Sequence, residues 1–188
     1  RRQRQMCIRD SDKVIDLARF AELGKAGVLA MLSDSTNAER PGYTSSERLV
    51  GESLSNLFKK AEGHRIVVAT FSSNIHRIQQ IIDEAARCKR KVAVSGRSML
   101  NVVNVASELG YLNVPSGILV EIETIKNYSP RELVIITTGS QGEAMSALSR
   151  MASKSHRKVE IGYNDCVIIS ARPIPGNEKT VYKVINDL

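Results

Sequence analysis

Four short polar segments of this sequence carry side chains that could bind an anion, and each follows a run of apolar residues. They are residues 72–74, 95–98, 139–143 and 172–177. A helical pattern begins at or just after each segment, so free backbone N–H groups at a helix start would lie beside these side chains. The carboxyl ends of parallel strands meet at one edge of a sheet, and we expect an anion-binding site at that edge.

The first segment combines hydroxyl, amide and cation-capable side chains. Ser72, Ser73 and Asn74 precede the helical pattern, and His76 and Arg77 lie in its first turn. Hydroxyl and backbone N–H groups could hold phosphate oxygens while Arg77 neutralises their charge. The alternative interpretation is that a serine only caps the helix and that His76 is a surface residue.

The second and third segments offer a cation and a glycine-containing turn. Arg97 would lie at a helix start, where a cation opposes the helix dipole unless an anion lies between them. Gly139 allows a ligand to approach the backbone closely, and Gly139, Ser140 and Gln141 are our candidate contacts there. This turn matches neither the Walker loop nor the GxGxxG pattern. A solvated arginine and an ordinary strand–helix turn are the alternative interpretations.

Asp34 is the carboxylate with the most suggestive position, two residues after the end of the apolar run 28–32. It could orient a histidine, bind a metal or act as a base. The three histidines, His64, His76 and His156, are too widely spaced to indicate a zinc cluster or a nucleophilic triad. The three cysteines lack CxxC spacing, so we expect a reducing cytosol. We expect no metal site and no complete reaction centre in this chain.

The apolar patterns predict an α/β fold, a mostly parallel sheet with helices on both faces. Strands are expected at residues 28–32, 65–71, 91–95, 118–122, 132–138 and 166–171. Helices are expected at residues 13–25, 44–62, 74–88, 97–109 and 143–153, and from about 176 to the end. Thr44 and Glu47 have the spacing of a capping box, which supports the second helix.

The composition is mildly basic, with a formal net charge of +7. This charge fits a nucleic-acid partner without requiring one. Arginines are concentrated in residues 1–11, which we expect to be non-native or disordered and exclude from the fold. No apolar run approaches the ~20 residues that cross a bilayer, so no membrane span is expected.

Five ordered segments resemble ribonuclease J. They are residues 33–39, 69–77, 94–99, 138–143 and 173–178. The similarity extends over residues 13–188 and implies a Rossmann-like β-CASP domain at residues 33–188. Residues 12–32 would then be the end of a metallo-β-lactamase domain.

This resemblance implies a cytoplasmic, metal-dependent ribonuclease that processes and degrades RNA by phosphodiester hydrolysis, as a 5′ exonuclease and endonuclease. Its substrate would be single-stranded RNA with a 5′-monophosphate end, and the full-length protein would be a homo-oligomer. Carried over by position, Asp34 supports a histidine beside the metals, and Ser72, Ser73 and Asn74 contact RNA. The family's HxHxDH motif is absent, so two zinc ions would bind outside this chain and the fragment alone would be inactive.

Two other functions remain open from the residues alone. The chain could be a free-standing phosphate- or RNA-binding module without catalysis, whose binding would weaken with salt. It could also be a Rossmann-type nucleotide-binding enzyme, although the glycine fingerprint of that class is missing.

Overall fold

The computed structural model describes residues 16–32, 39, 41 and 47–188. The chain divides into two compact units, Arg1–Glu52 and Ser53–Leu188. The predictions for residues 1–11, for Asp34 and for Thr44 fall outside the described residues.

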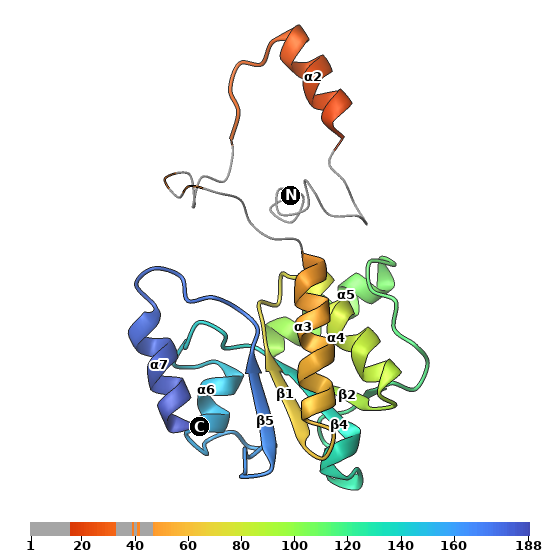
Figure 1. The fold of residues 1–188 in the computed structure, drawn as a ribbon, viewed down its shortest axis with the longest axis vertical. Helices are drawn as coiled ribbons and strands as arrows, with labels where there is room; N and C mark the ends of the chain where they lie inside the picture. Colours follow the sequence, from red (N-terminus) through yellow and green to blue (C-terminus); the bar gives the residue numbers. More distant parts are fainter. Residues whose placement is uncertain (1–15, 33–38, 40, 42–46) are drawn as a thin grey trace. The chain divides into compact units, whose positions relative to one another are not determined.

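The second unit is built on a five-stranded sheet in which every pair of neighbouring strands is parallel (Figure 1). Its strands are β1 (Arg65–Ala69), β2 (Lys91–Ser95), β3 (Leu119–Val120), β4 (Leu133–Thr137) and β5 (Asp165–Ile169), in the order β3-β2-β4-β1-β5. The central strand β4 is buried at all five positions, which explains its unbroken apolar sequence. The predicted fold class is confirmed.

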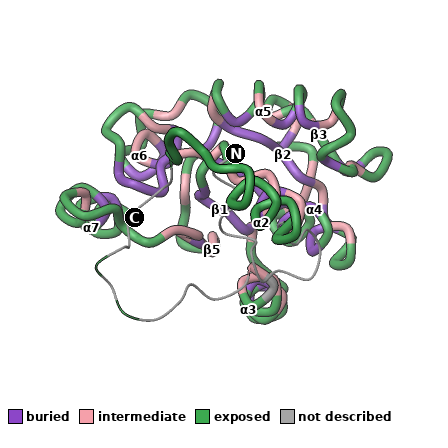
Figure 2. Tube along the Cα trace, turned by 90° about the horizontal axis from the view of Figure 1, so that it is seen from above, coloured by how far each residue is buried: buried purple, intermediate pink, exposed green. Residues whose placement is uncertain are grey.

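Helices cover both faces of the sheet, and three of them connect one strand to the next. They are α3 (Glu47–Lys60), α4 (Ile75–Arg87), α5 (Arg97–Glu108), α6 (Ala147–Ala152) and α7 (Glu178–Asp187), with short 3-10 turns η1 (Ile125–Asn127) and η2 (Pro130–Glu132). Figure 2 shows the buried stretches running along the strands and the inner sides of these helices.

Strand alternation and connection handedness divide the helices between the two faces. Val67 and Ala69 of β1 belong to one core cluster with Leu148 and Met151 of α6 and Val184 of α7. The connections through α4 and α5 cross the sheet in the direction opposite to the connection through α6. Because such connections are right-handed, α4 and α5 cover the other face.

The predicted element bounds hold within one to three residues for most of this unit, and the largest correction concerns α6. We expected a helix over residues 143–153, but α6 spans only Ala147–Ala152. Ser146 caps it by accepting a hydrogen bond from the Ser149 N–H at 3.3 Å. The residues after β4 instead form a turn, in which Gly139 and Gly142 both have positive φ.

The described part of the first unit contains α2 (Leu17–Ala26), in agreement with the short helix expected there. Asp16 caps α2 by accepting a hydrogen bond from the Arg19 N–H at 2.9 Å. The strand expected at residues 28–32 is wrong. These residues are exposed and belong to no described strand, and an apolar run without a neighbouring strand cannot complete its backbone hydrogen bonds.

Within the described ranges, no helix is both long enough and apolar enough to cross a membrane.

Candidate functional site

The segments that follow β1, β2, β4 and β5 lie side by side, and we call residues 70–74, 96–98, 138–146 and 170–177 the carboxyl edge. The Thr70 N–H donates to the Thr137 carbonyl at 3.1 Å, and the Ser170 N–H donates to the Ala69 carbonyl at 2.8 Å. A Cβ atom on Gly96 would lie 2.9 Å from Thr138 Oγ1. The edge predicted from the sequence therefore exists.

The course of the chain creates a topological switch point at this edge. β4 lies between β2 and β1, and the helix after β4 covers the opposite face from the helices after its two neighbours. In open α/β sheets, ligands bind outside the carboxyl ends of the strands where the connections diverge in this way. Of the predicted candidates, residues 72–74, 97 and 139–141 lie on the carboxyl edge, and His76 lies in the first turn of α4.

Asn74 and Arg77 serve the protein's own structure. The Asn74 side chain caps α4 by accepting a hydrogen bond from the Arg77 N–H at 3.1 Å. The Arg77 guanidinium is buried and donates to the carbonyl oxygen of Ser170 at 2.9 Å and to its hydroxyl oxygen at 2.5 Å. The expectation that Arg77 neutralises a ligand is not met, because its guanidinium is buried and already donates hydrogen bonds to the loop after β5.

Ser72, His76 and Arg97 remain more accessible. Ser72 and His76 are half-buried, whereas Ser73 and Arg97 are exposed. α5 begins with Arg97 and has no side-chain cap, because its capping residue is Gly96, with φ of 105°. The N–H groups at the start of α5 are therefore available to an anion, as Arg97 itself is.

The turn after β4 is buried more deeply than the sequence indicates. Gly139, Ser140 and Gln141 are all buried, and Gln141 is only 3% exposed. Its side-chain amide bonds to the segment 172–177, so any contact between this turn and a ligand would pass through backbone atoms. A Cβ atom on Gly142 would overlap the backbone of Thr180, which shows how closely this turn packs against α7.

The sequence predicted the segment after β5 as part of the anion-binding edge, but no individual residue in it was chosen as a candidate contact. Ser170 holds Arg77, and Arg172 is an exposed cation at the carboxyl edge. The available signal was an arginine placed between a strand end and two prolines, Pro173 and Pro175. Proline restricts the backbone dihedral φ, so the backbone directly after the exposed Arg172 has little freedom.

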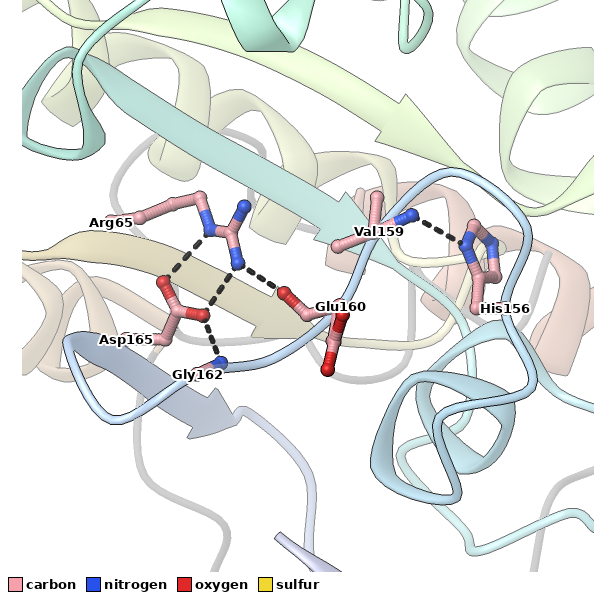
Figure 3. A network of polar contacts seen from close by, with 6 residues as sticks. All are labelled: Arg65, His156, Val159, Glu160, Gly162 and Asp165. Carbon is pink, nitrogen blue, oxygen red and sulfur yellow. Dashed lines mark hydrogen bonds and ion pairs between the residues drawn. The ribbon is translucent and has the colours of Figure 1, made fainter.

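A cavity of about 380 Å³ lies elsewhere, beside Arg65 and Leu133, the first residues of β1 and β4. Arg65 donates to both carboxylate oxygens of Asp165, at 2.8 Å and 2.5 Å, and also to the Glu160 carbonyl, as Figure 3 shows. Lys158 pairs with Glu123. Two of the four Lys and Arg side chains that line this cavity, Arg65 and Lys158, are therefore already paired.

His156 also lines this cavity but is held by the fold. Its Nδ1 accepts a hydrogen bond from the Val159 N–H at 3.1 Å (Figure 3). Burial lowers the pKa of His156, and the nearby charges of Arg150 and Lys158 lower it further. The imidazole is therefore kept neutral.

The described residues do not fit a metal centre. Among them, no three His, Cys, Asp or Glu side chains gather closely enough to hold an ion. Asp34, the one candidate linked to metals, lies outside this part of the chain.

The sequence comparisons identify the kind of domain to which this edge belongs. A family model described as the β-CASP domain of ribonuclease J matches residues 63–188. The chain belongs to the ribonuclease J β-CASP family. The match covers all five strands and the whole carboxyl edge.

Named ribonucleases J from several bacteria are similar to this chain. The Helicobacter pylori (strain ATCC 700392 / 26695) protein is 49% identical over 173 residues, which are 92% of this chain and 25% of that protein. Ribonuclease J of Thermus thermophilus is 48% identical over 94% of the chain and 30% of its own length. Ribonuclease J2 of Bacillus subtilis is 43% identical over 93% and 31%, respectively. The chain thus spans between a quarter and a third of these relatives.

Proposed function

We propose that this β-CASP chain is the RNA-binding part of a metal-dependent ribonuclease J, which processes and degrades RNA by phosphodiester hydrolysis. The observation that carries the proposal is the carboxyl edge, where helix starts and the exposed Arg97 and Arg172 lie at a topological switch point of the sheet. Cations and backbone N–H groups bind phosphates without reading sequence. Only 4% of the residues are aromatic, so binding depends on phosphates more than on base stacking.

The chemistry of bond cleavage belongs to groups outside the described residues. We propose two zinc ions, bound in a metallo-β-lactamase domain, as the source of the attacking hydroxide. Asp34 would support a histidine beside them. The role of this chain is to hold the RNA strand in register, and the 188-residue chain alone does not cleave RNA.

Three further properties are part of the same proposal. The RNA is single-stranded and preferably carries a 5′-monophosphate, which would gain an additional charged contact at the carboxyl edge. The full-length enzyme has both exonuclease and endonuclease activity and forms a homo-oligomer. It acts in the cytoplasm, where free thiols such as those of Cys88 and Cys166 stay reduced.

Salt-dependent RNA binding tests this proposal. The 188-residue chain should bind a 5′-phosphorylated single-stranded RNA with an affinity that falls linearly on a log–log plot against salt. Arg97→Ala should reduce the slope by about 0.7, the value for one phosphate contact to single strands. Arg131→Ala is the matched control, because Arg131 is also exposed but lies in η2, before β4 begins. An RNA affinity that does not depend on salt concentration would contradict the proposal. Equal changes of the salt slope in Arg97→Ala and Arg131→Ala would contradict it as well.

A further inference from the structure

We infer that Gln141 is a positioning residue for RNA binding: its buried amide fixes the segment 172–177 and thereby presents Arg172 as a further phosphate contact. This inference rests on the proposed function and deepens it. Arg172 touches the RNA, and Gln141 acts through Arg172.

The Gln141 amide binds the backbone on both sides of Pro173. Nε2 donates to the Arg172 carbonyl at 2.9 Å, and Oε1 accepts from the Ile174 N–H at 2.7 Å. The Asn177 side chain also donates to Oε1, at 3.5 Å. A rotated amide would place its donors against the Ile174 N–H and its acceptor against the Arg172 carbonyl, so only one orientation is satisfied. This pairing fixes the path of the chain at Arg172.

Gln141 can hold this segment because its own backbone is fixed. The Thr180 hydroxyl, on α7, donates to the Gln141 carbonyl at 3.1 Å, and the Gln141 N–H donates to a carboxylate oxygen of Glu143 at 3.2 Å. The adjacent Gly142 leaves no space for a side chain against α7. These contacts with α7 and within the turn therefore fix the position of the Gln141 backbone.

The other end of the same segment is held by Arg77. Its guanidinium donates to the Ser170 carbonyl and hydroxyl oxygens, two residues before Arg172. Pro173 restricts φ directly after Arg172 and disfavours helical backbone at Arg172 itself. Arg172 is consequently an exposed cation on a backbone that is fixed on both sides, which lowers the entropy lost when it binds.

The position of Arg172 suits a strand of RNA that crosses the carboxyl edge. Arg97 follows β2 and Arg172 follows β5, and β4 and β1 lie between these strands. Three strand spacings of about 4.8 Å place β2 and β5, the strands that these two cations follow, about 14 Å apart. No ion pair between residues 47 and 188 engages Arg172. An RNA crossing the carboxyl edge would therefore meet a cation after β2 and another after β5.

The test measures binding of a 5′-phosphorylated single-stranded RNA across a salt series. Arg172→Ala should weaken binding about fivefold at 0.1 M salt and reduce the slope by about 0.7. Gln141→Ala, and Gln141→Met, which keeps approximately the size but removes both the donor to Arg172 and the acceptor, should each weaken binding by a similar factor. In the Arg172→Ala background, the Gln141 substitutions should have no further effect, because their effect passes through Arg172.

Gln79→Ala is the matched control. Gln79 forms the same kind of bridge, accepting from the Asn113 N–H at 2.8 Å and donating to its carbonyl at 2.9 Å, but neither residue belongs to the carboxyl edge. Its substitution should leave RNA affinity unchanged. Thermal unfolding of every variant establishes that binding is compared between folded proteins.

Three results would overturn the inference. They are unchanged affinity in both Gln141 variants, a Gln141 effect that persists without Arg172, or an unchanged salt slope in Arg172→Ala. The last result is decisive even where a Gln141 variant fails to fold, because Arg172 is exposed. If the unmodified chain itself fails to bind RNA, the proposed function fails and this inference fails with it.

Discussion

The imidazole Nε2 of His156 lies 3.2 Å from the hydroxyl oxygen of Ser95, the last residue of β2. On the other side of the ring, Nδ1 faces the backbone N–H groups of Lys158 and Val159, at 3.3 Å and 3.1 Å. Two donors at Nδ1 require that the proton of the neutral imidazole sit on Nε2, which then donates to Ser95. The neutral ring thus links the loop before β5 to the end of β2.

Acidification should destabilise the fold through His156. Burial lowers the pKa of His156 in the folded chain, and the charges of Arg150 and Lys158 lower it further, so the unfolded chain binds its proton at higher pH. The stabilising contribution of His156 is therefore complete above about pH 6.5 and is lost as pH falls from there through the folded-state pKa. Urea unfolding from pH 7.5 to 5 should show this loss.

His156→Gln should remove that part of the pH dependence, because glutamine does not titrate. His64→Gln is the control, since no contact of this network involves His64. An identical pH slope in the unmodified chain and in His156→Gln would contradict the assignment.

Asp165→Asn should destabilise the second unit by about 1–3 kcal/mol, because it leaves the largely buried Arg65 without its counter-charge. The free energy of unfolding in urea measures this effect. Glu123→Gln serves for comparison, since the Glu123–Lys158 pair is exposed and should contribute little. If both substitutions shifted the unfolding midpoint equally, the Arg65–Asp165 pair would have no special role.

Gly142→Ala should destabilise the chain much more than Gly110→Ala. The two glycines have nearly the same φ, 71° and 70°, so the backbone strain of an added side chain is similar, about 1–2 kcal/mol. Only Gly142 is also blocked, by the backbone of Thr180, whereas nothing lies within 4 Å of a Cβ atom at Gly110. Thermal unfolding compares the variants, and equal losses would show that α7 moves aside without cost.

Local sequence patterns were sufficient for the sheet. The strands β1, β2 and β4 are short apolar runs bounded by turn residues. They are buried on both faces of the sheet, and such continuous apolar runs are typical of strands in parallel sheets. Residues 28–32 have the same pattern but form no strand among the described residues. A strand also needs a neighbour, and an apolar run alone does not indicate whether one is present.

The role of each polar side chain at the carboxyl edge was much harder to predict. Arg77 appeared to be a ligand contact because its sequence neighbours are hydroxyl residues, but its partner Ser170 is 93 positions away. Gln141 likewise binds residues more than 30 positions later. Such pairings depend on the tertiary fold, and a single sequence carries no signal for them. The predicted RNA contacts of Ser72, Ser73, Asn74, His76, Arg97, Gly139, Ser140 and Gln141 remain predictions.

The strand order has a consequence for how the chain folds during synthesis. β1 and β2 are separated by β4, so neither can pair with its long neighbour until residues 133–137 have been made. Before that point, β2 can pair only with the two-residue β3, and β1 has no partner, because β5 comes later still. A nascent chain that stalls before residue 133 would therefore expose two apolar strands, and we expect such a chain to depend on chaperones.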